Sequence, residues 1–264
     1  MAQIDKPNLH FATTLYTGNG STDRAVTVGF QPDWIWCKER SQTESNMLHD
    51  VHMNAGDYIR SNTADGLSNS GEMFKSITAT GFTVGTRGEV NENSQTYVNW
   101  SWKGGGTPSA NNVGSTASSV SANTTSGFSV VTWTGTGSAT TIGHGLGATP
   151  ELIIIKNKTD SVNWMFFARS MIAPGATNKE FFRLNADTGL QANGSATTFT
   201  STSNTTFGVG TDSYVNGSGN NMKAFVFAEK KGFSSFGRYT GNGNARGPFI
   251  YTGFRPAWVL QKQQ

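Results

Sequence analysis

The stretch GFQPDWIWCK, residues 29–38, recurs twice further along the chain. GATPELIIIK occupies residues 147–156, and GFRPAWVLQK occupies residues 253–262. In each copy a Pro precedes a short apolar run, and a Lys ends the motif. Because proline has a fixed φ and no N–H donor, it is tolerated at the entrance of a strand but not inside a central one. The motif therefore predicts a buried central strand in each copy, closed at the surface by the Lys.

The repeat extends well beyond these ten residues. Upstream of each motif stand YTGNG at residues 16–20, WTGTG at 133–137 and YTGNG at 239–243. Trp100-Ser101-Trp102 and Phe225-Val226-Phe227 close the first two copies with alternating aromatic side chains. A period of roughly one hundred residues is too long for a solenoid repeat. The pattern predicts a tandem array of domain-sized units.

The composition favours strands over helices. Hydrophobic residues make up 35% of the chain and charged residues 14%. Both fractions are lower than in an average globular domain, and Gly, Ser, Thr and Asn fill the difference. We predict an all-β fold of tandem antiparallel β-sandwich domains of the jelly-roll or lectin-like type. Residues 1–106 form the first sandwich, 107–127 a Gly/Ser/Thr/Asn-rich linker that is partly strand, 128–232 the second sandwich, and 233–264 the start of a third, incomplete repeat.

Several local expectations follow from this alignment. Part of 113–122 pairs with the start of the second copy, and residues 123–127 form the hairpin loop between them. Residues 46–52 form a strand rather than a helical turn. The third copy supplies two strands, too few for a stable domain. We therefore expect the natural chain to continue past Gln264. The alternatives are that these strands dock on another subunit, or that the sequence covers only the ordered part of the chain.

Charge and cysteine content argue against several classes of protein. The net charge is +3, and the basic residues are scattered in sequence, which disfavours nucleic-acid binding. The single cysteine, Cys37, excludes an internal disulfide. The first residues lack the apolar core of a secretory signal, and no apolar run is long enough to span a bilayer. We expect a protein made in a cytoplasm, with no membrane insertion.

The motifs of common enzymes are missing from the sequence. His49-Asp50-Val51-His52 resembles a metal-binding cluster, but the second copy has Phe166 in the place of His49. No Gly-x-Ser-x-Gly elbow is present. A pair of carboxylates can catalyse glycoside hydrolysis. Asp33 and Glu151 occupy equivalent places in the first two copies, but the third copy has Ala257 there. The sequence predicts no catalytic residue, no cofactor and no metal, and therefore not an enzyme.

Aromatic side chains suggest either a core or a platform for sugar rings. The counterparts of the tryptophans at 34, 36, 100 and 102 in the second copy are Leu, Ile and Phe, which indicates that most of these rings fill a core. Candidate ligand-binding residues are therefore sought outside the repeated positions. Tyr58, Trp164 and Tyr214 are the three candidates.

Taken together in tandem, the motifs YTGNG, GFxPxWIWxK, GFTVG and VxWxWKGG resemble repeats in virion proteins of tailed bacteriophages, especially marine ones. The resemblance covers nearly the whole chain. It implies lectin-like sandwiches in a tail fibre or receptor-binding protein of the virion, a homotrimer, and other virion proteins or a host surface glycan as partners. The alternative is a head decoration or tail adaptor protein, and a sugar-cleaving tailspike is a third hypothesis. The second copy departs from the pattern, with LIII at residues 152–155 in place of the Trp run.

Overall fold

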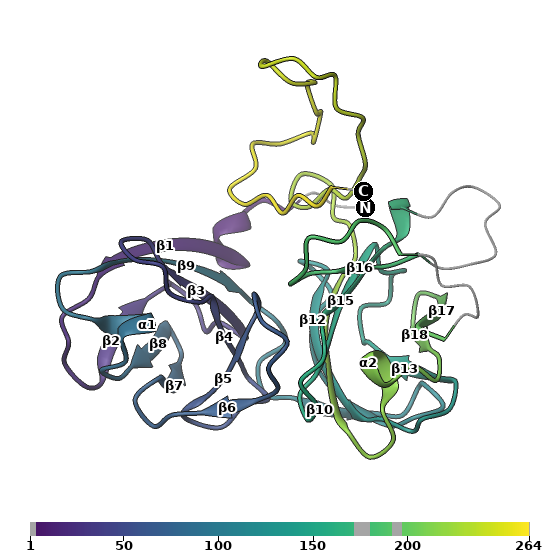
Figure 1. The fold of residues 1–264 in the computed structure, drawn as a ribbon, viewed down its shortest axis with the longest axis horizontal. Coiled ribbons are helices and arrows are strands. Elements are labelled where there is room, and N and C mark those ends of the chain that lie inside the picture. The colour runs from purple at the N-terminus through teal and green to yellow at the C-terminus, as the bar shows by residue number, and fades with distance from the viewer. Residues whose placement is uncertain (1–3, 172–179, 192–196, 264) are drawn as a thin grey trace.

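The computed structural model describes residues 4–171, 180–191 and 197–263. Two lobes lie side by side, and the last thirty or so residues lie above them (Figure 1). Each lobe is a sandwich of one large and one small antiparallel sheet, which confirms the prediction of an all-β sandwich fold. The described helices are single turns, and none has the length and apolar content needed to cross a membrane.

In the first lobe the large sheet has the order β1-β9-β3-β4-β5-β6, and the small sheet the order β2-β8-β7. The bounds in the large sheet are β1 Phe11–Thr17, β9 Thr96–Trp102, β3 Trp34–Glu39, β4 Met47–Asp50, β5 Asp57–Arg60 and β6 Ser68–Asn69. Those in the small sheet are β2 Arg24–Thr27, β8 Gly81–Val84 and β7 Phe74–Thr78. The helical turns are η1 Pro7–Leu9 and α1 Gly88–Asn91. Residues 47–50 are a strand, as expected for this part of the chain.

In the second lobe the large sheet has the order β10-β11-β12-β19-β14-β15-β16, and the small sheet the order β13-β18-β17. The bounds in the large sheet are β10 Ser109–Asn111, β11 Ser118–Asn123, β12 Phe128–Thr134, β19 Asn221–Phe227, β14 Leu152–Asn157, β15 Met165–Ala168 and β16 Phe182–Arg183. Those in the small sheet are β13 Thr140–Gly143, β18 Thr206–Val209 and β17 Phe199–Thr202. The helical turns are η2 Arg169–Met171 and α2 Ser213–Asn216.

The linker contributes directly to the second large sheet. Strand β11 pairs with β12 along its whole length, which is the pairing expected for part of 113–122. Gly127, with a φ of 72°, closes the turn by donating its N–H to Asn123 O at 2.9 Å. The predicted domain boundaries at 106, 127 and 232, and the tandem-repeat interpretation itself, stay predictions.

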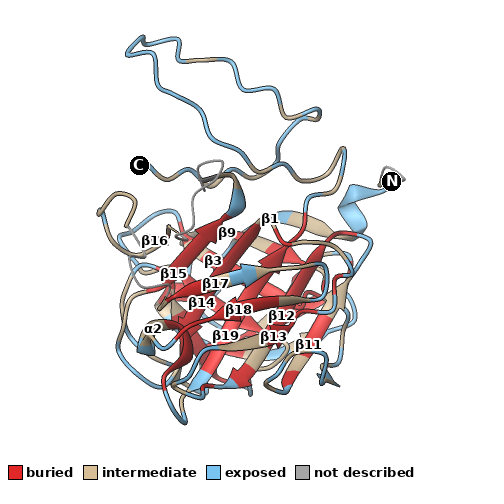
Figure 2. Cartoon of the chain, turned by 90° about the vertical axis from the view of Figure 1, so that its right-hand side faces the viewer, coloured by how far each residue is buried: buried red, intermediate tan, exposed pale blue. Residues whose placement is uncertain are grey.

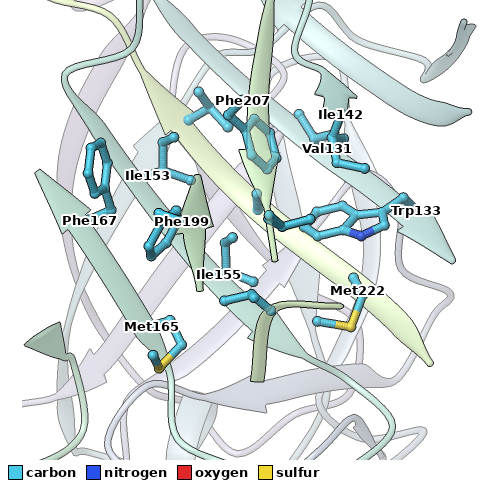
Figure 3. Close-up of a cluster of buried hydrophobic side chains, with 14 of the residues drawn as sticks. Val131, Trp133, Ile142, Ile153, Ile155, Met165, Phe167, Phe199, Phe207 and Met222 are labelled. Atoms are coloured by element: carbon cyan, nitrogen blue, oxygen red, sulfur yellow. The ribbon is translucent and has the colours of Figure 1, made fainter. Parts of the chain in front are cut away.

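Each lobe has its own core between its two sheets. In the second lobe, side chains of β12, β14 and β15 face those of β17 and β18, including Val131, Ile153 and Phe167 against Phe199 and Phe207 (Figure 3). Most of these strands are buried along their length (Figure 2). The core of the first lobe has the same position and comprises Val26, Ile35, Cys37, Met47, Tyr58, Met73, Phe74, Phe82, Val84, Val90 and Tyr97.

The tryptophans at 34, 36, 100 and 102 do not belong to these two cores. Successive side chains of a strand point to opposite faces. Ile35 enters the core of the first lobe, whereas Trp34 and Trp36 face the second lobe. The sequence indicated that most of these rings fill a core, but Trp34 and Trp36 do not fill the core of their own lobe. They are buried, as expected of core residues, but in a third core between the lobes.

This third core, the interlobe core, forms where the two large sheets pack face to face. Trp34 is fully buried, and its ring stacks on Phe225 of β19, with centroids 4.0 Å apart and planes at 18°. Trp34 also stacks on Trp102 of the neighbouring strand β9, with centroids 4.3 Å apart. The second lobe contributes aliphatic side chains from its own copy of the motif, Leu152 and Ile154. Aromatic rings from both large sheets, together with these aliphatic side chains, thus fill the space between the lobes.

In YTGNG at residues 16–20 and WTGTG at residues 133–137, the structure leaves no room for a side chain at the first glycine. A Cβ at Gly18 would collide with Glu92 O, and one at Gly135 would collide with Gly217 O. The second glycine of each motif has a positive φ, 65° at Gly20 and 67° at Gly137. These turns therefore need glycine both for close backbone approach and for left-handed conformation.

Two expectations about the repeated motif were wrong. Residues 233–263 contain no strand among the described residues, although two were expected there. A strand needs hydrogen-bonding neighbours, and the only bridge here joins Lys230 to Ser234. Moreover, Lys156 does not close its strand at the surface: it is fully buried, and its Nζ donates to Ala64 O of the first lobe at 2.8 Å. The Lys lies at the interlobe contact, where a backbone carbonyl replaces water.

Candidate functional site

A groove of about 420 Å³ opens on the seam between the lobes. We call it the seam groove. The first lobe, the loop after β16 and the C-terminal segment all contribute to it. Its lining residues are Trp36, Asn46, Ser61, Asn62, Leu184, Asn185, Ala186, Asp187 and Leu260.

The first lobe supplies an aromatic edge and oriented amides. Trp36 is almost fully buried, and its indole Nε1 donates to Asn46 Oδ1 at 3.1 Å. Asn62 Oδ1 accepts from Asn46 N at 3.1 Å, and Asn62 Nδ2 donates to Ser45 Oγ at 3.2 Å. These bonds fix the direction of each amide before any ligand arrives.

The second lobe supplies the opposite wall. Asn185 Oδ1 accepts from Trp164 N at 2.9 Å, which holds the loop 184–187 against the start of β15. Asp187 is exposed and belongs to no ion pair of the described residues. The Lys262 ammonium donates to Ala186 O and so ties the C-terminal segment to this wall.

Amides, a hydroxyl and one carboxylate beside apolar side chains can bind a ligand that is rich in hydroxyl groups. Glycoside hydrolysis needs two carboxyl groups at a defined separation. Among the described residues that line the seam groove, Asp187 is the only one with a carboxylate. The described lining therefore lacks the pair of carboxyl groups that glycoside hydrolysis uses.

A second hollow of about 300 Å³ lies beside β4 and β7 of the first lobe, and His49 lines it. His49 Nδ1 lies 2.8 Å from Asp57 O, and burial lowers the pKa of its imidazole. No group of three or more His, Cys, Asp or Glu side chains suited to a metal ion occurs in the parts of the chain that the structure describes. Burial also disfavours the charged forms of Asp33 and Glu151, the carboxylates at equivalent places in the first two copies, and it therefore raises the pKa of each.

The three candidate ligand-binding residues do not form one site. Trp164 is fully buried in the interlobe core, and its Nε1 donates to Arg60 O at 2.9 Å. Its ring has no exposed face, so the structure does not support a platform there. Tyr58 is buried, and the Arg60 guanidinium lies 5.0 Å from its ring centroid. Tyr214, half-buried on α2 of the other lobe, has the Arg183 guanidinium 6.0 Å from its ring centroid.

Sequence reasoning missed the buried charges at the interlobe contact. Lys223 of β19 and Asp50 of β4 are both fully buried and form an ion pair. Burial lowers the Lys223 pKa to about 8, although the Asp50 charge opposes this shift. Burial alone would raise the Asp50 pKa, but the charge of Lys223 lowers it. Lys223 lies within NMKAFVF, the sequence of β19. A Lys inside an otherwise apolar strand is the feature of the sequence that could have indicated a buried charge.

His52 belongs to the same buried group. Its Nε2 lies 3.1 Å from Ser119 O of the second lobe, and its Nδ1 lies 3.8 Å from Asp50 Oδ1. Burial lowers the His52 pKa to about 4. The imidazole is therefore neutral at neutral pH. The cluster of residues 49–52 joins the two lobes and does not present ligands to a metal.

The fold and the sites can be compared with known proteins. A search of curated proteins and a search of solved structures found no match. A family model, DUF7483, described as a domain of unknown function, matches residues 6–264. Because the match covers almost the whole sequence, the chain belongs to the DUF7483 family.

Proposed function

We propose that this protein is a structural protein of a tailed-bacteriophage virion, and that it acts as a tail fibre or receptor-binding protein at the host surface. The motifs that resemble virion repeats support the placement on a phage particle. The seam groove supports the receptor-binding role, because it combines fixed amides with an apolar floor. A host surface glycan is the ligand class that such a lining fits.

The two-lobe body suits a load-bearing role. Trp164 Nε1 and Lys156 Nζ of the second lobe donate to backbone oxygens of the first, and Leu67 N of the first donates to Lys158 O at 2.8 Å. These contacts add to the interlobe core, so the groove has rigid walls. A rigid site loses less conformational entropy when a ligand binds.

Host-cell and glycan binding by the purified full chain test this proposal. Asp187→Ala and Asn62→Ala should each weaken binding about three- to tenfold, which corresponds to the loss of one hydrogen bond. Asn112→Ala is the matched control, because Asn112 is exposed and lies outside the groove. Binding to neither host cells nor their glycans at micromolar concentration, or equal effects of all three variants, would contradict the receptor-binding role.

The alternative role, a head decoration or tail adaptor protein, is favoured by a different observation. Phe249, Tyr251 and Val259 of the C-terminal segment are 88%, 81% and 72% exposed. Large exposed apolar side chains are typical of contacts between proteins. Quantitative gel analysis of virions distinguishes the roles: a decoration protein occurs at hundreds of copies per particle, whereas a fibre occurs at far fewer.

A further inference from the structure

Strand β1 leaves one edge of the first large sheet unpaired. β1 pairs with β9, and no other described strand pairs with it. In the second large sheet β12 pairs with β19 in the same way, but β11 and β10 continue the sheet beyond it. The second lobe therefore demonstrates that a strand fits at the place that is open beside β1.

The backbone groups that point out of this edge can be identified. Lys103 N donates to His10 O at 2.9 Å, and Gly18 N donates to Gln95 O at 2.7 Å. In an antiparallel pair, residues alternate between those that face the partner strand and those that face away. His10 and Gly18 face β9, so the even-numbered residues between them face β9 as well. The N–H and C=O groups of the odd-numbered residues, 11, 13, 15 and 17, point outward.

The edge has few of the features that keep an edge strand from associating. Its sequence, FATTLYT, contains no charge and no proline, and Leu15 is 62% exposed. Natural edge strands are protected by lysine, proline, bulges or a covering segment. A seven-residue uncharged edge is a template for β-strand addition.

The C-terminal segment contains a matching stretch, GPFIYTG at residues 247–253. Phe249, Ile250 and Tyr251 favour the extended conformation, are exposed, and belong to no strand. We call residues 230–263 the arm. Its loop stands clear of both lobes (Figures 1 and 2).

The distribution of charge favours one orientation of the arm relative to β1. Residues 230–264 contain six Lys and Arg and no Asp or Glu, whereas residues 1–106 contain eight basic and eleven acidic side chains. Near the Thr17 end of β1, Gly18 packs against the backbone of Glu92, a residue that is exposed. An antiparallel arm would bring Arg246 to this acidic end.

We propose that residues 247–253 of one copy add as an antiparallel β-strand to the β1 edge of a second copy of this chain. The contact joins two different surfaces and is therefore heterologous, so it closes a ring or extends a filament according to its rotation. This inference concerns the chain's own association and does not rest on the role at the host surface.

Sedimentation velocity of the full chain at rising concentration tests the proposal. Leu15→Pro removes an outward N–H without touching the bonds to β9, and Ile250→Pro removes the strand conformation of the arm. Each should weaken self-association at least about tenfold. Val113→Ser is the matched control, because Val113 is 63% exposed but lies on the second lobe, and it should have no effect. A chain that stays monomeric at every concentration overturns the proposal.

Cysteine cross-linking then identifies the two surfaces. A Leu15→Cys chain mixed with an Ile250→Cys chain should give a disulfide-linked dimer with oxidised glutathione as the oxidant, while either chain alone should give little. The native thiol, Cys37, is fully buried and gives no background. A dimer formed by the Leu15→Cys chain alone would mean that two β1 edges pair with each other, and would overturn the proposal. Unchanged thermal unfolding of each variant excludes misfolding as the cause.

Discussion

Replacing Asp50 by Asn should destabilise the protein far more than a typical single substitution. Asp50 and Lys223 are 173 positions apart in sequence, and the packing of β4 on β19 brings them together. Both side chains are fully buried. Asn at position 50 keeps the shape of the side chain but removes the charge, and Lys223 is left as an uncompensated cation in the interlobe contact.

The expected loss follows from the cost of a buried, unpaired charge. Breaking a buried ion pair by removing one partner costs about 3–5 kcal/mol, whereas replacing both partners by apolar residues of similar volume is often neutral or stabilising. Asp50→Asn should therefore lower the free energy of unfolding by about 3–5 kcal/mol. The double variant Asp50→Leu/Lys223→Met should recover most of this loss, because no charge then remains buried.

Urea unfolding followed by tryptophan fluorescence measures these differences, since the chain contains seven Trp residues. The single variants Asp50→Leu and Lys223→Met form a double-mutant cycle with the double variant, which isolates the coupling between the side chains. A free energy of unfolding for Asp50→Asn within about 1 kcal/mol of the parent would refute the reasoning, because that loss is typical of any substitution. A double variant as unstable as the single ones would contradict the account of a buried charge.

Three further predictions concern the core, a turn and pH. Trp34→Ala should lower the free energy of unfolding by about 3–5 kcal/mol in the same urea assay, because the ring is fully buried; a loss below about 1 kcal/mol would contradict its place in the interlobe core. Gly18→Ala should cost roughly 1–3 kcal/mol, since its Cβ meets Glu92 O, while Gly71→Ala, whose Cβ meets open space, should cost little. His52 has a folded pKa of about 4, below its ordinary 6.5, so its contribution to stability is present above pH 6.5 and is lost as the pH falls towards 4. His52→Gln should flatten that part of the stability profile, and an unchanged profile would argue against a buried neutral imidazole.

The sandwich could be predicted from the sequence because its signals are local. Proline before a short apolar run marks β3 and β14, and the alternating stretch that ends at Trp102 marks β9. The glycines of YTGNG and WTGTG mark turns. Each of these features depends on a strand period of two or on turn chemistry, and both are visible in a window of a few residues.

The direction in which the tryptophans point could not be predicted in the same way. Alternation reveals that Trp34 and Ile35 lie on opposite faces, but both faces of this sheet are buried, one by its own lobe and one by the other. No local feature of the sequence indicates which face of the sheet packs within its own lobe and which packs on the other lobe. The burial of Lys156 was missed for the same reason, because Ala64 O, which accepts its hydrogen bond, comes from a distant segment.

The candidate site was the least predictable feature. The seam groove combines four positions of the first lobe, four of a loop in the second, and Leu260. Within one strand or loop these residues resemble ordinary polar surface. Only the packing of the lobes brings them together, and that packing depends on contacts such as the stacking of Trp34 on Phe225 across the interlobe core.

Differential scanning calorimetry of the full chain tests the central claim most directly, which is that both lobes share one aromatic core. The account predicts one cooperative transition with equal calorimetric and van't Hoff enthalpies, because neither lobe can unfold without exposing the ring of Trp34 or that of Phe225. Two separate transitions, with Trp34→Ala shifting only the one that belongs to the first lobe, would contradict it.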